Sequence, residues 1–364
     1  MRKFRSSVGV ARAVSRALGA GLMSATNELP PASDPAVMAD RLLAALVPGS
    51  SGAVRALRRL SGGANMETWA FDLEHGSATV PLILRRQPGV IGRNTTDWNE
   101  LGIADEAALL SAAGATGVPV PTVRHLLTAG DELGEGYVMS RERGEALPQR
   151  LLSDARFAAA RDKLAWQCGH ALGQIHKVPV DTLPAGLPDH SGPVLFEHAQ
   201  SLLDTHDNGS PVLQLGLDWL RDNRPGSQSK ALVHGDFRNG NLLVDEGGLV
   251  AVLDWELAHL GDPVRDLGYL SANVWRFGAD APVGGFGQYD DLLAGYEAAT
   301  GQRPAMDEII YWQAYAALFW GTVCLIMLEK YRSGEDASLE RAAVGRRLSE
   351  AEIDLLLLLE GNLR

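Results

Sequence analysis

Cysteine is scarce in this chain: only Cys168 and Cys324 occur among its 364 residues. Neither has a second Cys or a His nearby at metal-ligand spacing, so the sequence shows no disulfide framework and no zinc-binding motif. A reducing compartment suits such a protein, and we therefore expect it in the cytoplasm.

Basic residues are also in deficit, with 33 Lys and Arg against 45 Asp and Glu and a formal net charge of −12. Nucleic-acid binding needs a basic surface that displaces counterions from phosphates, so we predict no nucleic-acid partner. Uninterrupted apolar runs are lacking as well. The longest candidate, from Tyr311 to Leu328, contains Gln313 and Thr322, which predicts a buried core helix and no membrane partner.

The first part of the chain has no acidic residue until Glu28, while five Lys and Arg residues occur there. It shows no periodic core face, so we expect residues 1–32 to form a basic, disordered tail. This composition also resembles a transit peptide, and Met23 or Met38 could be the true start. The sequence leaves these alternatives open.

Residues 33–143 are predicted to form a small N-terminal lobe with an antiparallel sheet and a helix against it. A helix begins after Ser33-Asp34-Pro35, which combine a capping residue with proline in the first turn. Turn residues and short apolar runs then indicate five strands and one further helix. The strands are expected at 54–60, 67–73, 80–85, 120–127 and 136–140, and the helix at 104–113.

Residues 144–364 show mostly helical periodicity and are predicted to form a larger C-terminal lobe. One hairpin interrupts the helices, with strands at 240–245 and 249–254 around Gly247-Gly248. The fold class is therefore α+β, with two lobes.

The most informative segment runs from His234 to Asp254. Asp236, Asn241 and Asp254 lie at the ends of short apolar strands. Phosphoryl transfer needs a group that orients the attacking hydroxyl and oxygen ligands that hold Mg²⁺ against the phosphates. These three side chains could supply both, and the five-residue spacing from Asp236 to Asn241 equals that of the protein-kinase catalytic loop.

The linked motifs His-Gly-Asp-Phe-Arg-x-Gly-Asn at 234–241, Leu-Asp-Trp-Glu at 253–256 and Gly-Asp-Pro-x-x-Asp at 261–266 resemble the aminoglycoside phosphotransferase and choline kinase superfamily. The resemblance implies a protein-kinase-like two-lobed fold, with ATP and Mg²⁺ as cofactors and a small-molecule hydroxyl as phosphate acceptor. It also implies that Asp236 is the catalytic aspartate and that Asn241 and Asp254 are the magnesium ligands.

Residues before this segment are predicted to bind the nucleotide. Gly62 and Gly63 lie between two strands, where backbone N–H groups can approach phosphates closely. Arg85 ends the third strand, at the position where kinases carry the phosphate-pairing lysine, while Arg86 should face the other way. Glu106 is expected to pair with Arg85, in preference to Glu100. Ser140 and Arg141, at the junction between the lobes, complete the predicted set.

Other polar residues are expected to be structural. His234 should brace the catalytic loop, His176 should be a satisfied helix-end histidine, and Asp262 and Asp266 should brace loops. Glu256 could touch a second metal or the substrate. Trp275, Arg276, Phe277 and Tyr289 could line an acceptor pocket.

Two other functions remain as alternatives: an inactive nucleotide-binding pseudokinase, and a metal-dependent hydrolase built on His234 and Asp236 with Asp254 and Asp262. The run from Ser61 to Thr68 resembles the branch associated with acyl-CoA dehydrogenases. This favours a metabolite or hydroxyacyl-CoA-like acceptor over an aminoglycoside. The sequence decides neither between ATP and GTP nor the oligomeric state.

Overall fold

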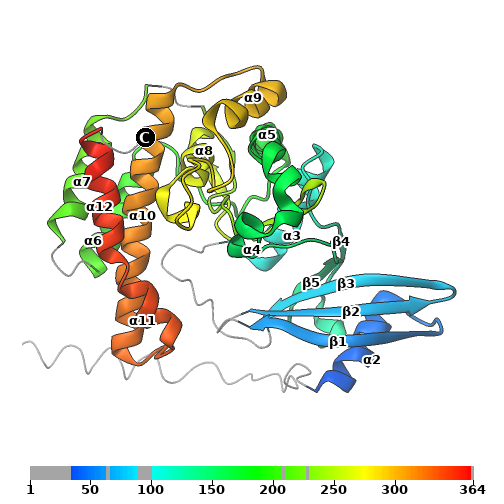
Figure 1. Cartoon of the computed structure of the whole chain (residues 1–364). Coiled ribbons are helices and arrows are strands. Elements are labelled where there is room, and N and C mark those ends of the chain that lie inside the picture. Colours follow the sequence, from blue (N-terminus) through cyan, green and yellow to red (C-terminus); the bar gives the residue numbers. More distant parts are fainter. Residues whose placement is uncertain (1–33, 63–65, 88–100, 207–209, 227–228, 362–364) are drawn as a thin grey trace, which may run out of the picture.

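The computed structural model describes residues 34–62, 66–87, 101–206, 210–226 and 229–361. They form two lobes, a sheet-containing N-terminal lobe and a larger helical C-terminal lobe (Figure 1). The predicted α+β, protein-kinase-like class is confirmed. The predicted basic tail, residues 1–32, lies outside the described residues.

The N-terminal lobe contains one five-stranded antiparallel sheet with strand order β1-β2-β3-β5-β4. Its strands are β1 (Gly52–Gly62), β2 (Glu67–His75), β3 (Ala78–Gln87), β4 (Val123–Leu126) and β5 (Glu135–Ser140). β4 is shorter than predicted. Pro121 lies in the missing part and has no N–H for strand pairing, which explains the difference.

Two helices accompany this sheet. Helix α2 (Pro35–Leu46) begins as predicted, because the Asp34 side chain accepts the N–H of Ala36. Its Met38 and Leu42 pack in the same cluster as Trp69, Phe71 and Leu84 of the sheet. Helix α3 (Ile103–Ala115) contacts β4 and β5 and joins the main core of the protein.

The C-terminal lobe is built around α5 and α10. Helix α5 (Ala158–His176) packs closely on α9 (Tyr289–Thr300): a Cβ at Gly169 would lie 1.9 Å from the Leu292 carbonyl oxygen. The other helices are α4 (Pro148–Ser153), α6 (Val194–His206), α7 (Pro211–Asp222), α8 (Val264–Leu270), α10 (Met306–Ser333), α11 (Leu339–Gly345) and α12 (Leu348–Leu359). Short 3₁₀ turns occupy Ala129–Asp131, Ala155–Phe157, Val180–Thr182 and Asn273–Arg276.

The apolar helix α10 is a core element, as predicted. It packs against α7, α8, α11 and α12, and it crosses the helical lobe in Figure 1. Among the described helices, it alone is long and apolar enough to cross a membrane, but 78% of its apolar window is buried inside the protein.

Four short strands frame the catalytic segment. The predicted hairpin is present as β7 (Leu242–Asp245) and β8 (Gly248–Val252), so Asp254 follows the strand instead of ending it. A second pair, β6 (Ala231–Val233) with β9 (His259–Gly261), was not predicted. Three-residue strands are too short to show a periodic pattern in sequence. The two pairs bring His234, Asp254 and Asp262 into one region.

Candidate active site

The catalytic loop leaves β6 through a tight turn at Gly235. This glycine has φ +82°, and a Cβ there would lie 2.3 Å from the Leu257 carbonyl oxygen, so a side chain has no room. The Asp266 carboxylate accepts the backbone N–H groups of His234 and Gly235 at 2.8 and 2.9 Å. His176 contacts the same carboxylate at 3.1 Å. Asp266 and His176 therefore hold the loop, in agreement with their expected structural roles.

His234 has both ring nitrogens occupied. Nε2 donates to the Leu253 carbonyl at 3.1 Å, and Nδ1 accepts the N–H of Asp236 at 3.2 Å. The ring is fully buried beside Phe237 and Trp255. Burial lowers the pKa of His234, so the neutral ring is favoured. His234 links the catalytic loop to the segment before Asp254 and has no nitrogen left for a metal.

Asp236 is held by three neighbours. Arg238 Nε donates to Asp236 Oδ1 at 3.0 Å, and Asn241 Nδ2 donates to Oδ2 at 2.5 Å. Burial raises the pKa of Tyr269 far above its usual range, and interaction of its hydroxyl with the Asp236 carboxylate raises it further. Tyr269 therefore stays protonated beside Asp236. These contacts fix the orientation of the Asp236 carboxylate, which the sequence predicts to orient the acceptor hydroxyl.

Arg85 joins the two lobes. Its Nη2 donates to Asp254 Oδ1 at 3.0 Å and to Glu256 Oε2 at 3.3 Å. Its Nε lies 3.4 Å from Glu106 Oε1, an ion pair without hydrogen-bond geometry. Burial lowers the pKa of Arg85, but Glu106 and Asp254 outweigh this effect and raise it. The guanidinium is therefore charged, and the predicted pairing with Glu106 is present. Glu100 lies outside the described residues.

Arg86 faces the opposite side of β3, as strand alternation predicts. It is 1% exposed and donates two hydrogen bonds to Glu67 Oε2 and one to the Leu133 carbonyl. This arginine is therefore part of the N-terminal core and lies away from the cleft.

Asp254 has an unusual backbone, with φ +63° in a residue that is not glycine. Such conformations cost free energy and often occur at functional sites. Its side chain is 33% exposed and that of Glu256 is 41% exposed. Burial and the Asp254 charge raise the pKa of Glu256 to about 7. Two acids and one guanidinium thus meet at the lobe interface.

A cavity of about 240 Å³ lies between the lobes at this point. Arg85, Glu106, Asn241 and Asp254 form its polar part. Its apolar part consists of Leu110, Pro121, Tyr137, Met139, Leu253 and Trp255, and Thr68 and Gly240 complete the lining. Oxygen ligands suit Mg²⁺, and the Asn241 amide and Asp254 carboxylate both border the cavity, so this donor set fits the predicted metal. The apolar part offers a surface for a planar base.

Two of the predicted nucleotide-binding residues, Ser140 and Arg141, do not line this cavity. Ser140 Oγ donates to Glu142, and Arg141 pairs with Asp72 at 2.5 Å, so both side chains are directed to other partners. A role in nucleotide binding for Ser140 and Arg141 can then involve only their backbone groups. Gly62 ends β1 opposite Glu67, and Gly63 lies outside the described residues.

Of the four residues that could line an acceptor pocket, Trp275 lies near the catalytic loop, whereas Arg276 and Tyr289 have other partners. The Trp275 ring lies under the Arg238 guanidinium at 4.5 Å and is therefore close to Asp236. Arg276 instead donates to the Ser271 carbonyl, and Tyr289 accepts from Gln313. Phe277 is 37% exposed.

Arg238 and Tyr269 both interact with Asp236, although the sequence pattern predicted a role for neither. Arg238 lies inside the motif used to recognise the site, two residues after Asp236, so its position was a usable signal. Tyr269 follows Asp266 by three residues, and only folding of α8 brings it to the catalytic loop.

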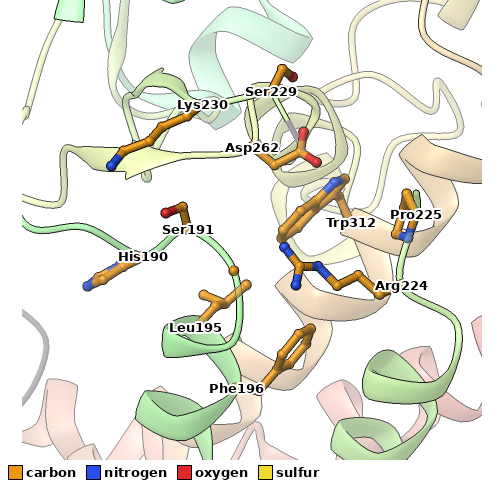
Figure 2. Close-up of a pocket in the computed structure, with 11 residues that line it drawn as sticks. His190, Ser191, Leu195, Phe196, Arg224, Pro225, Ser229, Lys230, Asp262 and Trp312 are labelled. Carbon is orange, nitrogen blue, oxygen red and sulfur yellow. The ribbon is translucent and has the colours of Figure 1, made fainter. Parts of the chain in front are cut away.

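A second cavity, of about 150 Å³, lies apart from this site (Figure 2). Of the residues singled out from sequence, only Asp262 lines it. Figure 2 shows Asp262 with Arg224, Lys230, His190 and Trp312 around the opening. Burial raises the pKa of Asp262 to about 6, and its Oδ1 accepts the N–H of Val264. This contact agrees with a loop-bracing role.

Comparisons with known proteins agree with this geometry. A sequence model of the phosphotransferase enzyme family matches residues 56–309. Acyl-CoA dehydrogenase family member 10 of Mus musculus is 27% identical over 198 residues, which cover 52% of this chain and 18% of that protein. The chain thus spans about a fifth of that relative.

Solved structures show the same fold. A protein of Ralstonia eutropha described as an aminoglycoside phosphotransferase superposes with a TM-score of 0.68 at 22% identity, covering 90% of this chain and 98% of that one. The streptomycin–ATP ternary complex of APH(2")-IIa gives a TM-score of 0.53 at 16% identity, covering 80% and 90%.

Proposed function

The chain belongs to the phosphotransferase enzyme family, and from this premise we propose that it is an ATP-dependent kinase of a small-molecule hydroxyl. The observation that carries the proposal is the convergence of Asp236, Asn241, Asp254 and Arg85 at the interface between the lobes. The ATP complex of a structural neighbour supports ATP as the phosphoryl donor.

Asp236 is the residue that orients the acceptor hydroxyl. Phosphoryl transfer depends mainly on positioning and on charge stabilisation, and a carboxylate fixed by Arg238 and Asn241 is suited to positioning. The hydroxyl proton would pass toward Asp236 as the new oxygen–phosphorus bond forms. Arg85 would contact the phosphates, since its guanidinium is charged and borders the cavity.

Asn241 and Asp254 would hold Mg²⁺, which neutralises phosphate charge when it is bound. Glu256 is next to Asp254 and contacts the same arginine, so it could supply a further oxygen. The peptide oxygen of Asp236 accepts from Asn241 Nδ2 at 3.0 Å, which leaves the amide oxygen of Asn241 for the metal. Asn241 therefore connects the acceptor side of the site with its nucleotide side.

For the acceptor, we favour a hydroxylated metabolite or a hydroxyacyl-CoA-like molecule over an aminoglycoside. The mouse relative's name supports an acyl-CoA connection. We also retain the cytoplasm as the proposed location, because Cys168 and Cys324 are both free and buried.

Nucleotide binding separates this function from its alternatives. A thermal-shift titration should give an increase of about 2 to 5 °C with saturating Mg-ATP, and little with ATP plus EDTA. GTP in place of ATP tests donor preference. Slow, acceptor-independent ATP hydrolysis should accompany binding. Binding without any hydrolysis would favour a pseudokinase, and no nucleotide-dependent shift would favour a hydrolase and contradict the proposal.

A further inference from the structure

The cavity of Figure 2 lies at the far end of the β6–β9 pair from the catalytic loop. Lys230 precedes β6, Asp262 follows β9, and both residues line the cavity at this end of the antiparallel pair. His234 and the catalytic loop follow β6 at its other end. Three strand residues span about 10 Å. A molecule in this cavity would therefore be separate from the acceptor, and phosphoryl transfer does not explain the residues that line it.

Arg224 borders the cavity as a cation without an acidic partner. It follows α7, is half-buried, and has neither a hydrogen bond nor an ion pair from its guanidinium among the described residues. Its contact there is the face of Phe196, with the guanidinium 5.8 Å from the ring centroid. Arg221, three residues earlier, instead pairs with Asp218 at 3.2 Å. A ring face attracts a cation only weakly compared with a carboxylate, so the donors of Arg224 remain available to a ligand.

Trp312 of α10 supplies a second donor. Its side chain lines the cavity, the residue is 6% exposed, and its Nε1 has no hydrogen-bond partner among the described residues. Close packing on α8 fixes the ring, since a Cβ at Gly268 would lie 2.4 Å from the Trp312 Cβ. Trp275 and Trp320 also lack a partner for Nε1 in this part of the chain, but neither lines this cavity or the one between the lobes. A buried N–H without an acceptor costs free energy, which a ligand oxygen would recover.

Asp262 offers an acceptor to the same cavity. Its Oδ1 accepts the N–H of Val264, and no hydrogen bond from the described residues occupies Oδ2. Burial and the charge of Glu308 raise the pKa of Asp262 to about 6, although the charges of His176 and Arg224 act in the other direction. The carboxylate is therefore mostly ionised at pH 7.5, and its free oxygen accepts a hydrogen bond.

The remaining titratable groups of the cavity are paired or neutral. Lys230 Nζ lies 2.5 Å from Asp189 Oδ2. The His190 ring is neutral at pH 7.5, because burial lowers its pKa to about 3. Asp262 is the only acidic residue among the described residues that line the cavity. The cavity thus combines donors that lack acceptors with one ionised carboxylate.

From this set of groups we propose that the cavity of Figure 2 binds a small oxyanion that also carries a hydroxyl group, with hydrogen phosphate as the simplest example. The anionic oxygens would accept from Arg224 and from Trp312 Nε1, and the hydroxyl would donate to Asp262 Oδ2. An oxyanion without a proton would instead place its charge against the Asp262 carboxylate, which is unfavourable. An α-hydroxycarboxylate has the same combination of groups. The inference is independent of the kinase function.

The size of the cavity limits the ligand. Its volume is about 150 Å³. An engineered cavity of this volume binds benzene, so a ligand of roughly six non-hydrogen atoms fits. Phosphate and lactate are in this range, whereas a nucleotide is far larger. ATP at the lobe interface should therefore not compete for this cavity.

The test compares oxyanions that differ in the hydroxyl. Calorimetric titration of the full chain at pH 7.5, without nucleotide, uses inorganic phosphate against sulfate and lactate against propionate. Phosphate keeps a proton at this pH and sulfate does not. We expect phosphate to bind roughly tenfold or more tightly than sulfate, and lactate to exceed propionate in the same way. The ratio of phosphate to lactate affinity shows which anionic source is preferred.

Variants then assign this preference to the cavity. Asp262→Asn keeps an oxygen for the N–H of Val264 and replaces the free oxygen by an NH₂ donor, so the phosphate preference over sulfate should fall to about twofold or less. Arg224→Gln should weaken phosphate binding by roughly tenfold or more, since a charge-assisted contact is lost. Arg221→Gln is the matched control and should leave phosphate affinity unchanged, because Arg221 already pairs with Asp218.

Failure of this inference differs from failure of the kinase function. Equal binding of phosphate and sulfate by the wild type, or no binding of either, would overturn the site, and so would an unchanged preference in Asp262→Asn. Phosphate affinity that survives Arg224→Gln would place the anion elsewhere and overturn it as well. If Asp262→Asn does not fold, the wild-type ratio and Arg224→Gln decide the question. Loss of Mg-ATP binding would contradict the proposed function and leave this site untouched.

Discussion

Substitution of Asp236 and of Asp254 should impair the protein in different ways. Asp236→Asn keeps an oxygen for Arg238 but turns an NH₂ group toward Asn241 Nδ2, a donor that now lies 2.5 Å from Asp236 Oδ2. This donor–donor contact should cost about 1 to 3 kcal/mol of stability. Asn241 keeps its hydrogen bond to the backbone oxygen of residue 236, so its position should be retained. Mg-ATP affinity should therefore change little.

Turnover of Asp236→Asn should nevertheless fall by about 10² or more, because the group that orients the hydroxyl has lost its charge. Asp254→Asn should behave differently. It removes the carboxylate that contacts Arg85 at 3.0 Å and that is predicted to bind Mg²⁺. Loss of a charged contact of about 1.4 to 3 kcal/mol should raise the magnesium needed for ATP binding roughly 10- to 100-fold.

The assay is a magnesium titration of ATP binding and of intrinsic ATP hydrolysis, which requires no knowledge of the acceptor. Asn241→Ala should resemble Asp254→Asn in milder form. Asp162→Asn, on the exposed side of α5, serves as the control. The assignment of the two carboxylates is wrong if Asp236→Asn abolishes nucleotide binding while Asp254→Asn leaves binding and magnesium dependence intact.

Three further substitutions test the register of β3 and the pocket of Figure 2. Arg85→Ala should weaken Mg-ATP binding, measured by calorimetric titration. Arg86→Ala should instead lower the free energy of unfolding by about 3 to 5 kcal/mol, measured by urea unfolding, because its ion pair with Glu67 is lost, and Mg-ATP binding by the folded protein should stay nearly normal. If Arg86→Ala weakens binding more than Arg85→Ala does, this register of β3 is wrong. The pKa of Asp262 is raised to about 6 in the folded protein, so between about pH 4 and 6 the unfolded chain has lost this proton while the folded protein still holds it. The free energy of unfolding of the wild type should therefore fall as pH rises from about 4 to 6. Asp262→Asn keeps an oxygen for the N–H of Val264 but cannot titrate, so it should remove about 1 to 2 kcal/mol of this pH-dependent loss of stability. Urea unfolding of both proteins between about pH 4.5 and 7 measures the difference, and parallel stability curves for wild type and variant would disprove it.

The local parts of the site could be predicted from sequence because their signals lie close together in the chain. Asp34 begins its helix as expected, and strand alternation places Arg85 in the cleft and Arg86 in the core. The side-chain partners of Ser140 and Arg141 were not predicted from the sequence. Their partners, Glu142 and Asp72, are chosen by the tertiary arrangement, which the sequence pattern does not contain.

Long-range pairing explains the other differences. β6 and β9 have three residues each and pair across 28 positions, so neither has a periodic signal of its own. The contact of Tyr269 with Asp236 requires the same pairing, because β9 positions α8 against the catalytic loop.

One short helix, α8, connects the two sides of the site. Asp262 accepts the N–H of Val264 at its start and so fixes where the helix begins. Asp266 then holds the backbone of His234 and Gly235, while Tyr269 reaches Asp236. A shift of the helix start by one residue would rotate all later side chains by about 100° and would move both contacts away from the loop. The spacing of the Gly-Asp-Pro-x-x-Asp segment therefore matters for geometry. It sets the catalytic loop and the position of Tyr269 together, so a change in the helix start should lower turnover.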